Sequence, residues 1–252
     1  MEPIKRLLQD RIAARIEPNK AILIFGARRV GKTVLMRQLI NGFEGKTMLL
    51  NGEDYDTLAQ NIPEIGTKLK LIVDEIEGIR VIASGSSSFD LLNKAGEPLV
   101  GRSTLFHLAP FSQKEIAPTE TALETRQNLE SRLIYGSYPE VVTLDSFERK
   151  TDYLRDIVGA YLLKDILAID GLKNSGKMKD LLRLIAFQLG SEVSYDELGK
   201  HLGMSKNTVE KYLDLLSNVF VVYRLGAYAR NLRKEATKVG KWYFYDNGIR
   251  NA

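Results

Sequence analysis

The sequence lacks cysteine altogether and contains only two histidines and one tryptophan among its 252 residues. Without cysteine the chain can form neither a disulfide bond nor a thiolate metal site. His107 and His201 lie far apart, and neither belongs to a cluster of Asp, Glu or His at ligand spacing, so no zinc site is predicted. No apolar run approaches the roughly 20 residues of a membrane span, and the N-terminus has no apolar signal region. We therefore expect a cytoplasmic protein without a membrane partner.

The composition is that of an ordinary globular protein, with 44% hydrophobic and 27% charged residues. The chain is long enough for two modest domains with cores of their own. Its net charge of +4 is unevenly distributed, because residues 171–252 hold 14 Lys and Arg against 8 Asp and Glu. This surplus indicates either an anionic partner for the C-terminal third or simply a solvated basic face.

Residues 26–33 read Gly-Ala-Arg-Arg-Val-Gly-Lys-Thr, which is the G-x-x-x-x-G-K-T spacing of a phosphate-binding P-loop. An apolar run at 21–25, rich in strand formers, precedes this motif, and apolar residues at helical spacing follow it to residue 40. Strand, glycine loop and helix are the context that the motif needs, and they disfavour a chance glycine turn. The glycines let the backbone wrap a phosphate, and the N–H groups of the helix N-terminus attract its charge.

The motif predicts a site for ATP or GTP with Mg²⁺. Lys32 can reach the β- and γ-phosphates and the Thr33 hydroxyl can ligate Mg²⁺, so we predict catalytic roles for both. The nucleotide-binding residues predicted from the loop and the start of the helix are Gly26, Ala27, Arg28, Arg29, Val30, Gly31, Lys32, Thr33 and Val34.

The N-terminal part alternates between strand and helix patterns. Helices are predicted at 4–16 and 32–40, and short strands at 21–25, 46–51, 79–83 and 104–108. This alternation is typical of an α/β fold, here a P-loop NTPase core with a parallel sheet and helices on both faces. Ligands bind such sheets at the carboxyl ends of strands, where the P-loop, the serine run 84–88 and the acidic run 53–56 are expected.

The pattern becomes helical from residue 123 onward, with one long helix at 153–167 and a linker at 170–176. A helix-turn-helix follows, for which Ser194 and Ser205 are the predicted N-caps. The elements after the linker are predicted helices at 177–189, 195–202 and 206–217 and strands at 219–225 and 241–245. Three helices and a basic β-hairpin predict a winged helix. The predicted domains are a P-loop core at 1–120, a helical lid or connector at 121–170 and a winged-helix domain at 171–252.

A hydrolytic P-loop protein also needs an acid at the end of a neighbouring strand, and Asp74 and Glu75 follow an apolar run. The next strand starts near residue 79, however, whereas a parallel crossover needs about a dozen residues. Apolar residues from 65 to 76 also recur at helical spacing, so a strand and a helix both stay open, with the helix favoured. If the segment is a helix, either an acid of the run 53–56 substitutes or a segment is missing near Leu58–Gln60.

Several ordered motifs extend over nearly the whole chain. They are 26–33, 85–88, 101–102, 108–115 (Leu-Ala-Pro-Phe-Ser-Gln-Lys-Glu), 135–142 (Tyr-Gly-Ser-Tyr-Pro-Glu-Val-Val), 161–166 and 243–250. Together they resemble the bacterial and archaeal predicted ATPases of the AAA+ superfamily that carry a domain of unknown function called DUF4143.

The resemblance implies ATP rather than GTP as the nucleotide, and it implies three further site residues. Ser86 would occupy the sensor position beside the γ-phosphate, which is a catalytic role, and Pro139 would lie near the adenine. Arg102 would sense phosphate or act across a subunit boundary, which leaves self-association open. Each residue also has a structural alternative. Ser86 could simply belong to a flexible loop, Pro139 could only shape a turn, and Arg102 could only form a salt bridge.

The chain departs from this family in two ways. Members show a strand ending in Asp-Glu before a linker like 60–63 and a helix like 64–77, whereas here the linker and helix occur without that strand. Members also continue beyond the position of Ala252 into a module suspected to be nuclease-like. This sequence does not include that module, so we claim no nuclease activity for it.

Three functions compete at this point. The preferred one is an ATPase switch, in which ATP closes the winged-helix domain over the P-loop domain and hydrolysis reopens it. The second is a DNA-binding protein that uses residues 205–240 and holds a structural or regulatory nucleotide. Its supporting side chains on the second helix of the helix-turn-helix are Lys206, Asn207, Thr208 and Lys211. The third is a protein-interaction scaffold with an inert nucleotide site, which the presence of Lys32 and Thr33 disfavours.

Overall fold

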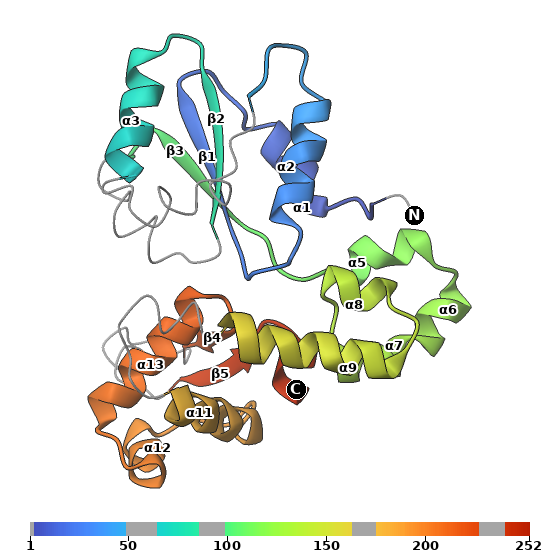
Figure 1. The fold of residues 1–252 in the computed structure, drawn as a ribbon, viewed down its shortest axis with the longest axis vertical. Coiled ribbons are helices and arrows are strands. Elements are labelled where there is room, and N and C mark those ends of the chain that lie inside the picture. The colour runs from blue at the N-terminus through green and yellow to red at the C-terminus, as the bar shows by residue number, and fades with distance from the viewer. Residues whose placement is uncertain (1–2, 49–64, 86–98, 163–174, 227–239) are drawn as a thin grey trace, which may run out of the picture. The chain divides into compact units, whose positions relative to one another are not determined.

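A parallel β-sheet of three short strands forms the centre of the N-terminal part in a computed structural model of the chain (Figure 1). The structure describes residues 3–48, 65–85, 99–162, 175–226 and 240–252. Its contacts divide the chain into two units, one of residues 1–26 and 31–108 and one of residues 27–30 and 109–252. Each unit is described by itself.

The sheet has the strand order β2-β1-β3, and both neighbours run parallel to β1. The strands are β1 (Lys20–Phe25), β2 (Arg80–Gly85) and β3 (Ser103–His107). Residues 21–25 of β1 are all buried, which explains why this strand is a continuous apolar run. The parallel α/β sheet is therefore confirmed. The strand predicted at 46–51 is not, because residues 46–48 lack strand structure and residues 49–51 fall outside the described part.

Helices cover both sides of this sheet, with α3 on one side and α1 and α2 on the other (Figure 1). They are α1 (Leu7–Ala13), α2 (Lys32–Asn41) and α3 (Ile65–Glu75). The helix predicted at 4–16 is shorter than expected at both ends. Arg6, which precedes it, is buried with an extended backbone (φ −86°, ψ 132°), so helical geometry starts only after that residue.

Helix α3 decides between the two interpretations of Asp74 and Glu75. The segment is helical, and Leu69 and Val73 are its buried residues. Asn19, whose own φ is +56°, ends the helix by donating its side-chain N–H to the carbonyl oxygens of Val73 (3.0 Å) and Ile76 (3.2 Å). The interpretation of Asp74-Glu75 as the end of a strand is therefore wrong.

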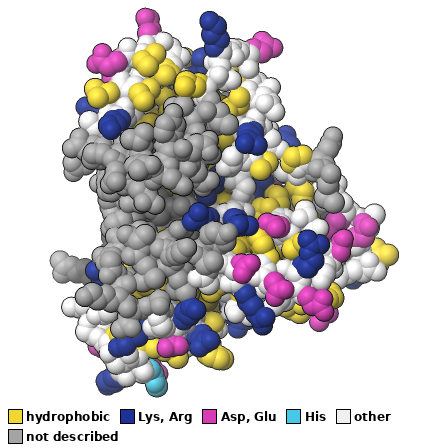
Figure 2. Space-filling model, in the orientation of Figure 1, with side chains coloured by type: hydrophobic (Ala, Val, Ile, Leu, Met, Phe, Trp, Pro, Cys, Tyr) yellow, Lys and Arg dark blue, Asp and Glu magenta, His cyan; other side chains and the backbone are white. Residues whose placement is uncertain are grey.

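The predicted apolar face of α3 is only partly covered. Figure 2 shows hydrophobic side chains gathered on the surface over this helix. The exposed ones are Leu71, Ile72 and Ile76, with 52%, 38% and 51% of their area accessible. Of the residues that form the helical pattern in the sequence, Ile72 and Ile76 thus remain at the surface.

The second unit begins with a series of short helices. They are α5 (Gln113–Ile116), the 3₁₀ turn η1 (Ala117–Thr119), α6 (Ala122–Gln127), α7 (Leu129–Tyr135), α8 (Pro139–Thr143), α9 (Phe147–Asp156) and the π-helical turn η2 (Ile157–Leu162). The helix predicted at 153–167 starts earlier, because Ser146 caps α9 by accepting the N–H of Arg149. Residues 163–167 lie outside the described ranges.

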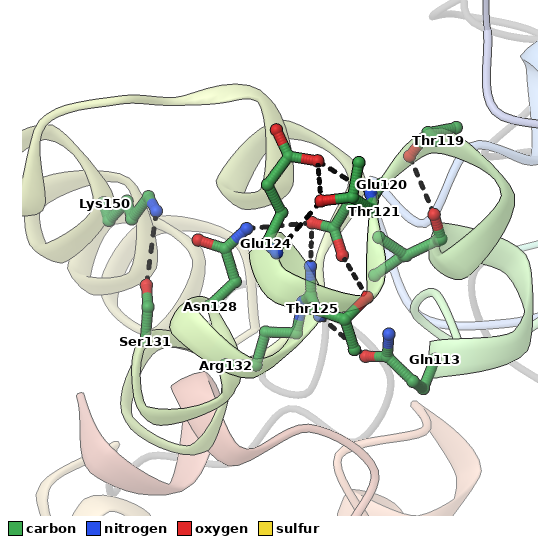
Figure 3. A network of polar contacts seen from close by, with 11 residues as sticks. Gln113, Thr119, Glu120, Thr121, Glu124, Thr125, Asn128, Ser131, Arg132 and Lys150 are labelled. Atoms are coloured by element: carbon green, nitrogen blue, oxygen red, sulfur yellow. Dashed lines mark hydrogen bonds and ion pairs between the residues drawn. The ribbon is translucent and has the colours of Figure 1, made fainter.

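A polar network joins α5, α6 and α7 (Figure 3). Its centre is the carboxylate of Glu120, which forms an ion pair with Arg132 and accepts hydrogen bonds from Thr125 (3.1 Å) and Asn128 (2.9 Å). Arg132 also donates to the side chain of Gln113 at 2.8 Å. Only 13% of each side chain in the Glu120–Arg132 pair is exposed, so water competes weakly for these groups.

We expect Glu120→Ala to lower the free energy of unfolding by about 3 kcal/mol, because it leaves a mostly buried guanidinium without its carboxylate. Urea unfolding followed by circular dichroism measures this loss. Glu124→Ala is the control, since Glu124 is also an acidic residue of this region but is exposed to solvent, where it accepts the N–H of Thr121 at the start of α6. Equal losses in the two variants would show that burial of the Glu120 pair contributes nothing.

The C-terminal part of the unit contains three helices and an antiparallel pair of strands. These elements are α11 (Ser175–Phe187), α12 (Tyr195–Leu202), α13 (Lys206–Asn218), β4 (Val222–Leu225) and β5 (Lys241–Phe244). Both predicted serine caps are confirmed, because the side chains of Ser194 and Ser205 accept the N–H groups of Glu197 and Thr208. Strand β4 is shorter than predicted, because Phe220 has a φ of +60°, which is incompatible with an extended strand.

Two motifs that lie far apart in the sequence meet near α7. Asp246 is 6% exposed and caps a helix absent from the sequence prediction, α15 (Asn247–Asn251), by accepting the N–H of Gly248 at 2.8 Å. Its other carboxylate oxygen accepts the N–H of Ser137 at 2.7 Å. Burial raises the pKa of Asp246, and these N–H donors oppose that change. The motifs at 135–142 and 243–250 thus contact each other through Asp246, and we call this contact the joint at Asp246.

Of the helices that the described residues form, none combines the length and the apolarity needed to cross a membrane.

Candidate functional site

The P-loop connects β1 directly to α2. Gly31 adopts a φ of +93° and serves as the N-cap of α2, and the N–H of Leu35 donates to its carbonyl oxygen at 3.0 Å. Ala27 and Val30 are buried, with 5% and 0% of their area exposed, so they fix the loop from beneath. Strand, glycine loop and helix therefore follow one another as the motif predicts, and the N-terminal N–H groups of a ten-residue helix stand at the end of the loop.

Lys32 and Thr33 occupy the first turn of α2. The Lys32 ammonium donates to the carbonyl oxygen of Gly26 across the loop at 2.8 Å. The lysine therefore lies over the loop where the motif places a phosphate, and the Thr33 side chain is exposed to solvent beside it. No group of three or more His, Asp or Glu in the part of the chain that the structure describes could hold a metal ion.

The carboxyl ends of the neighbouring strands lie level with the start of the loop. Phe25, the last residue of β1, pairs with Gly85 on one side and with His107 on the other. His107 is exposed, with its ring 6.5 Å from that of Phe25, and partial desolvation of the imidazole lowers its pKa, so it is mainly neutral at pH 7. Ser86, the predicted sensor residue, falls outside the described residues.

Arg102 and Asp74 lie at the other end of the sheet. The Arg102 guanidinium donates to the Asp74 carboxylate at 2.6 Å, and its carbonyl oxygen accepts the N–H of Ala21, near the start of β1. The strand β1 separates them from the P-loop by roughly 15 Å at about 3.3 Å per residue. The predicted phosphate-sensing role of Arg102 is therefore not supported within one chain, and Asp74 is not placed to hold a nucleotide-bound metal.

The tip of the P-loop contacts helices of the second unit, to which residues 27–30 belong. The guanidinium of Arg29 lies 3.7 Å from the carboxylate of Glu140 and 5.7 Å from the ring centre of Tyr153. Glu140 follows Pro139, the first residue of α8. The structure thus brings the proline predicted near the adenine next to a residue that contacts the loop. No pattern in the sequence indicates this contact.

The exposed face of α13 carries both signs of charge. Of the four side chains that support DNA binding in the sequence, Lys206, Asn207 and Lys211 are exposed and Thr208 is partly buried. Glu210 and Asp214 on the same helix are exposed as well. Lys206 forms an ion pair with Asp196 at 3.8 Å. The helix therefore offers no excess of positive charge to an anionic partner. The basic residues at 227–239 lie beyond the part of the chain that is described.

Two family models match the chain. The model described as an AAA domain matches residues 18–59 and 58–117, which include the P-loop and the parallel sheet. The model described as a domain of unknown function, DUF8612, matches residues 126–252. The C-terminal match is thus to DUF8612, and not to the DUF4143 domain that the motifs resemble.

The relatives are proteins whose names assign no function. An uncharacterized protein of Haemophilus influenzae is 25% identical, over 90% of this chain and 68% of its own length. An uncharacterized protein of Methanocaldococcus jannaschii is 22% identical, over 89% of this chain and 60% of its own length. An uncharacterized protein of Mycobacterium tuberculosis is 26% identical, over 76% of this chain and 42% of its own length. The chain therefore spans between 42% and 68% of the length of these relatives.

The comparisons also bear on the segment that the sequence suggests is missing. The two pieces of the AAA match meet at residues 58–59, within the predicted join at Leu58–Gln60. The alignment with the Haemophilus protein runs over 272 positions, which is more than the 252 residues of this chain. That relative therefore has residues where this chain has a gap.

Proposed function

The chain belongs to the DUF8612 family and carries an AAA-type P-loop domain, and from this premise we propose that it is an ATP-binding switch. The observation that supports this most strongly is the β1–loop–α2 arrangement, with Lys32 folded over the loop and Gly31 at the helix N-terminus. In this proposal ATP binding changes how the P-loop domain engages the three-helix and β-hairpin part, which we propose to be a winged helix.

The residues of the loop have distinct parts in this proposal. The N–H groups of the loop and of the first turn of α2 donate to phosphate oxygens, and Lys32 leaves the Gly26 carbonyl to neutralise the β- and γ-phosphates. Thr33 orients its hydroxyl toward the metal. Mg²⁺, when bound, would be held by the Thr33 hydroxyl and would withdraw charge from the phosphates. Ser86 and Pro139 remain proposed contacts to the γ-phosphate and to the adenine.

We further propose that hydrolysis by this chain is slow. Asp74 lies on a helix and pairs with Arg102 away from the loop, so it does not supply the acid that activates water. The AAA match, which is interrupted at residues 58–59, supports the loss of a strand that ends in an acid. The switch would then be reset by nucleotide exchange and not by turnover.

The test is to incubate the purified chain with ATP and Mg²⁺ and to measure both binding and the nucleotide recovered. We expect saturable binding and recovery of the bound nucleotide as ATP. If the wild type produces ADP and the Lys32→Ala variant does not, slow hydrolysis is contradicted. The acids of the run 53–56 would then be the candidates for activating water. Absence of binding would overturn the proposed function itself.

DNA binding through residues 205–240 stays a prediction without further support, because α13 presents two acidic and two basic side chains to solvent.

A further inference from the structure

The P-loop carries an arginine that its phosphate-binding geometry does not require. Arg29 has a φ of +65°, a left-handed conformation in which the loop turns outward. Its side chain reaches α8 and α9, where it meets the carboxylate of Glu140 and the ring of Tyr153. All three residues belong to the same compact unit. A cation from the loop is thus held between an anion and an aromatic face.

The surroundings favour the charged guanidinium at this position. Tyr153 is half-buried, and burial together with the negative charge of Glu140 raises its pKa to about 12. Its ring therefore stays neutral at pH 7 and can attract a cation through its face. The Tyr153 hydroxyl lies near Arg29 and Glu140, but it makes no hydrogen bond of good geometry with any described group. The contact combines the charge of Glu140 with the ring face of Tyr153.

We propose that Glu140 and Tyr153 form a latch on Arg29 that opposes ATP binding and is released when nucleotide phosphate attracts the guanidinium. This inference rests on the proposed function, since it assigns the regulation of the same nucleotide site. A carboxylate near the loop carries one negative charge, whereas the phosphates of ATP carry several. The phosphates therefore compete effectively for the same arginine once they enter the loop.

The strength of the latch suits a reversible contact. About half of the Glu140 side chain and 40% of the Arg29 side chain are exposed, and ion pairs of this kind are weak because water screens them. Release of the latch would therefore change the affinity for ATP by roughly 2- to 5-fold and not by orders of magnitude. Because Glu140 is the second residue of α8, directly after Pro139, release also frees the start of that helix.

The experiment measures ATP affinity in a double-mutant cycle. Glu140→Gln removes the charge with little change of shape, and we expect it to tighten ATP binding roughly 2- to 5-fold. The same substitution in an Arg29→Gln background should have no effect, because no guanidinium remains to be held. Tyr153→Leu, which removes the aromatic face, should shift the affinity in the same direction as Glu140→Gln.

Glu148→Gln is the matched control, since it removes a negative charge from the first turn of α9 without touching Arg29. We expect it to bind ATP as the wild type does. Equal tightening by Glu140→Gln in the two Arg29 backgrounds would overturn the latch, because it would show direct repulsion of the phosphates by Glu140. Unchanged affinity in Glu140→Gln would overturn it as well. Failure of the wild type to bind ATP would instead overturn the proposed function, and the latch with it.

Discussion

Replacing Lys32 by alanine is expected to weaken ATP binding by roughly 100-fold while leaving the fold intact. A hydrogen bond to a charged group contributes about 1.5–3 kcal/mol, which corresponds to roughly one or two orders of magnitude in affinity. Lys32 is only partly buried, and its ammonium donates to the carbonyl oxygen of Gly26. Water can replace the ammonium there, so the substitution should remove phosphate binding without unfolding the loop.

Isothermal titration with ATP and Mg²⁺ measures this loss, and circular dichroism confirms that the variant is folded. Arg37→Ala provides the comparison, because Arg37 is an exposed cation on the same helix outside the loop. We expect that variant to retain the affinity of the wild type. Wild-type affinity in folded Lys32→Ala would mean that ATP binds elsewhere or that the loop is not a phosphate site.

Gly136→Ala is expected to destabilise the second unit by about 4 kcal/mol, which is a large fraction of the stability of an ordinary domain. Gly136 has a φ of +73° and a ψ of −158°, a region that side chains essentially exclude and that costs about 1–3 kcal/mol. A Cβ atom there would lie 1.9 Å from the Oδ1 atom of Asp246. The buried carboxylate would have to move and would lose the N–H of Ser137, which adds to the backbone strain.

The midpoint of urea unfolding measures this effect, and Gly190→Ala separates its two causes. Gly190 lies in the same unit and also has a positive φ, of +79°, but an added Cβ would meet only the Tyr243 hydroxyl at an ordinary 3.9 Å. That variant should lose only the backbone share of the energy. If Gly136→Ala is no less stable than Gly190→Ala, the carboxylate of Asp246 is not packed as tightly as the structure indicates.

The sequence predicts well those features that depend only on residues close together in the chain. The P-loop context depends on the segments directly beside it, and the caps at Ser194 and Ser205 need only a backbone N–H three residues further along. The helical spacing of the apolar residues in α3 likewise predicted the structure better than the resemblance of Asp74-Glu75 to the end of a strand. The apolar spacing could not show that part of its face remains at the surface, because exposure depends on which elements pack against a helix.

Other features depend on contacts that no local pattern encodes. The pair Arg102–Asp74 joins residues 28 positions apart, and Asn19 ends α3 from 54 positions away. The positive φ of Phe220 shortened a strand that a run of valines predicted, because the chain turns there out of α13 and into β4. The contact between Arg29 and Glu140 was equally invisible, although each residue lies in a motif that the sequence singles out.

The joint at Asp246 also sets an order of events during synthesis. Asp246 is made 109 residues after Ser137, whose N–H it accepts. At roughly 5–20 residues per second, the ribosome needs about 5–20 s to cover that interval. Throughout it the turn at Gly136 has no carboxylate to fix it, and α7 lacks the helix that later packs beside it. The nascent second unit thus stays incomplete, and open to proteases and chaperones, until its C-terminal motif emerges.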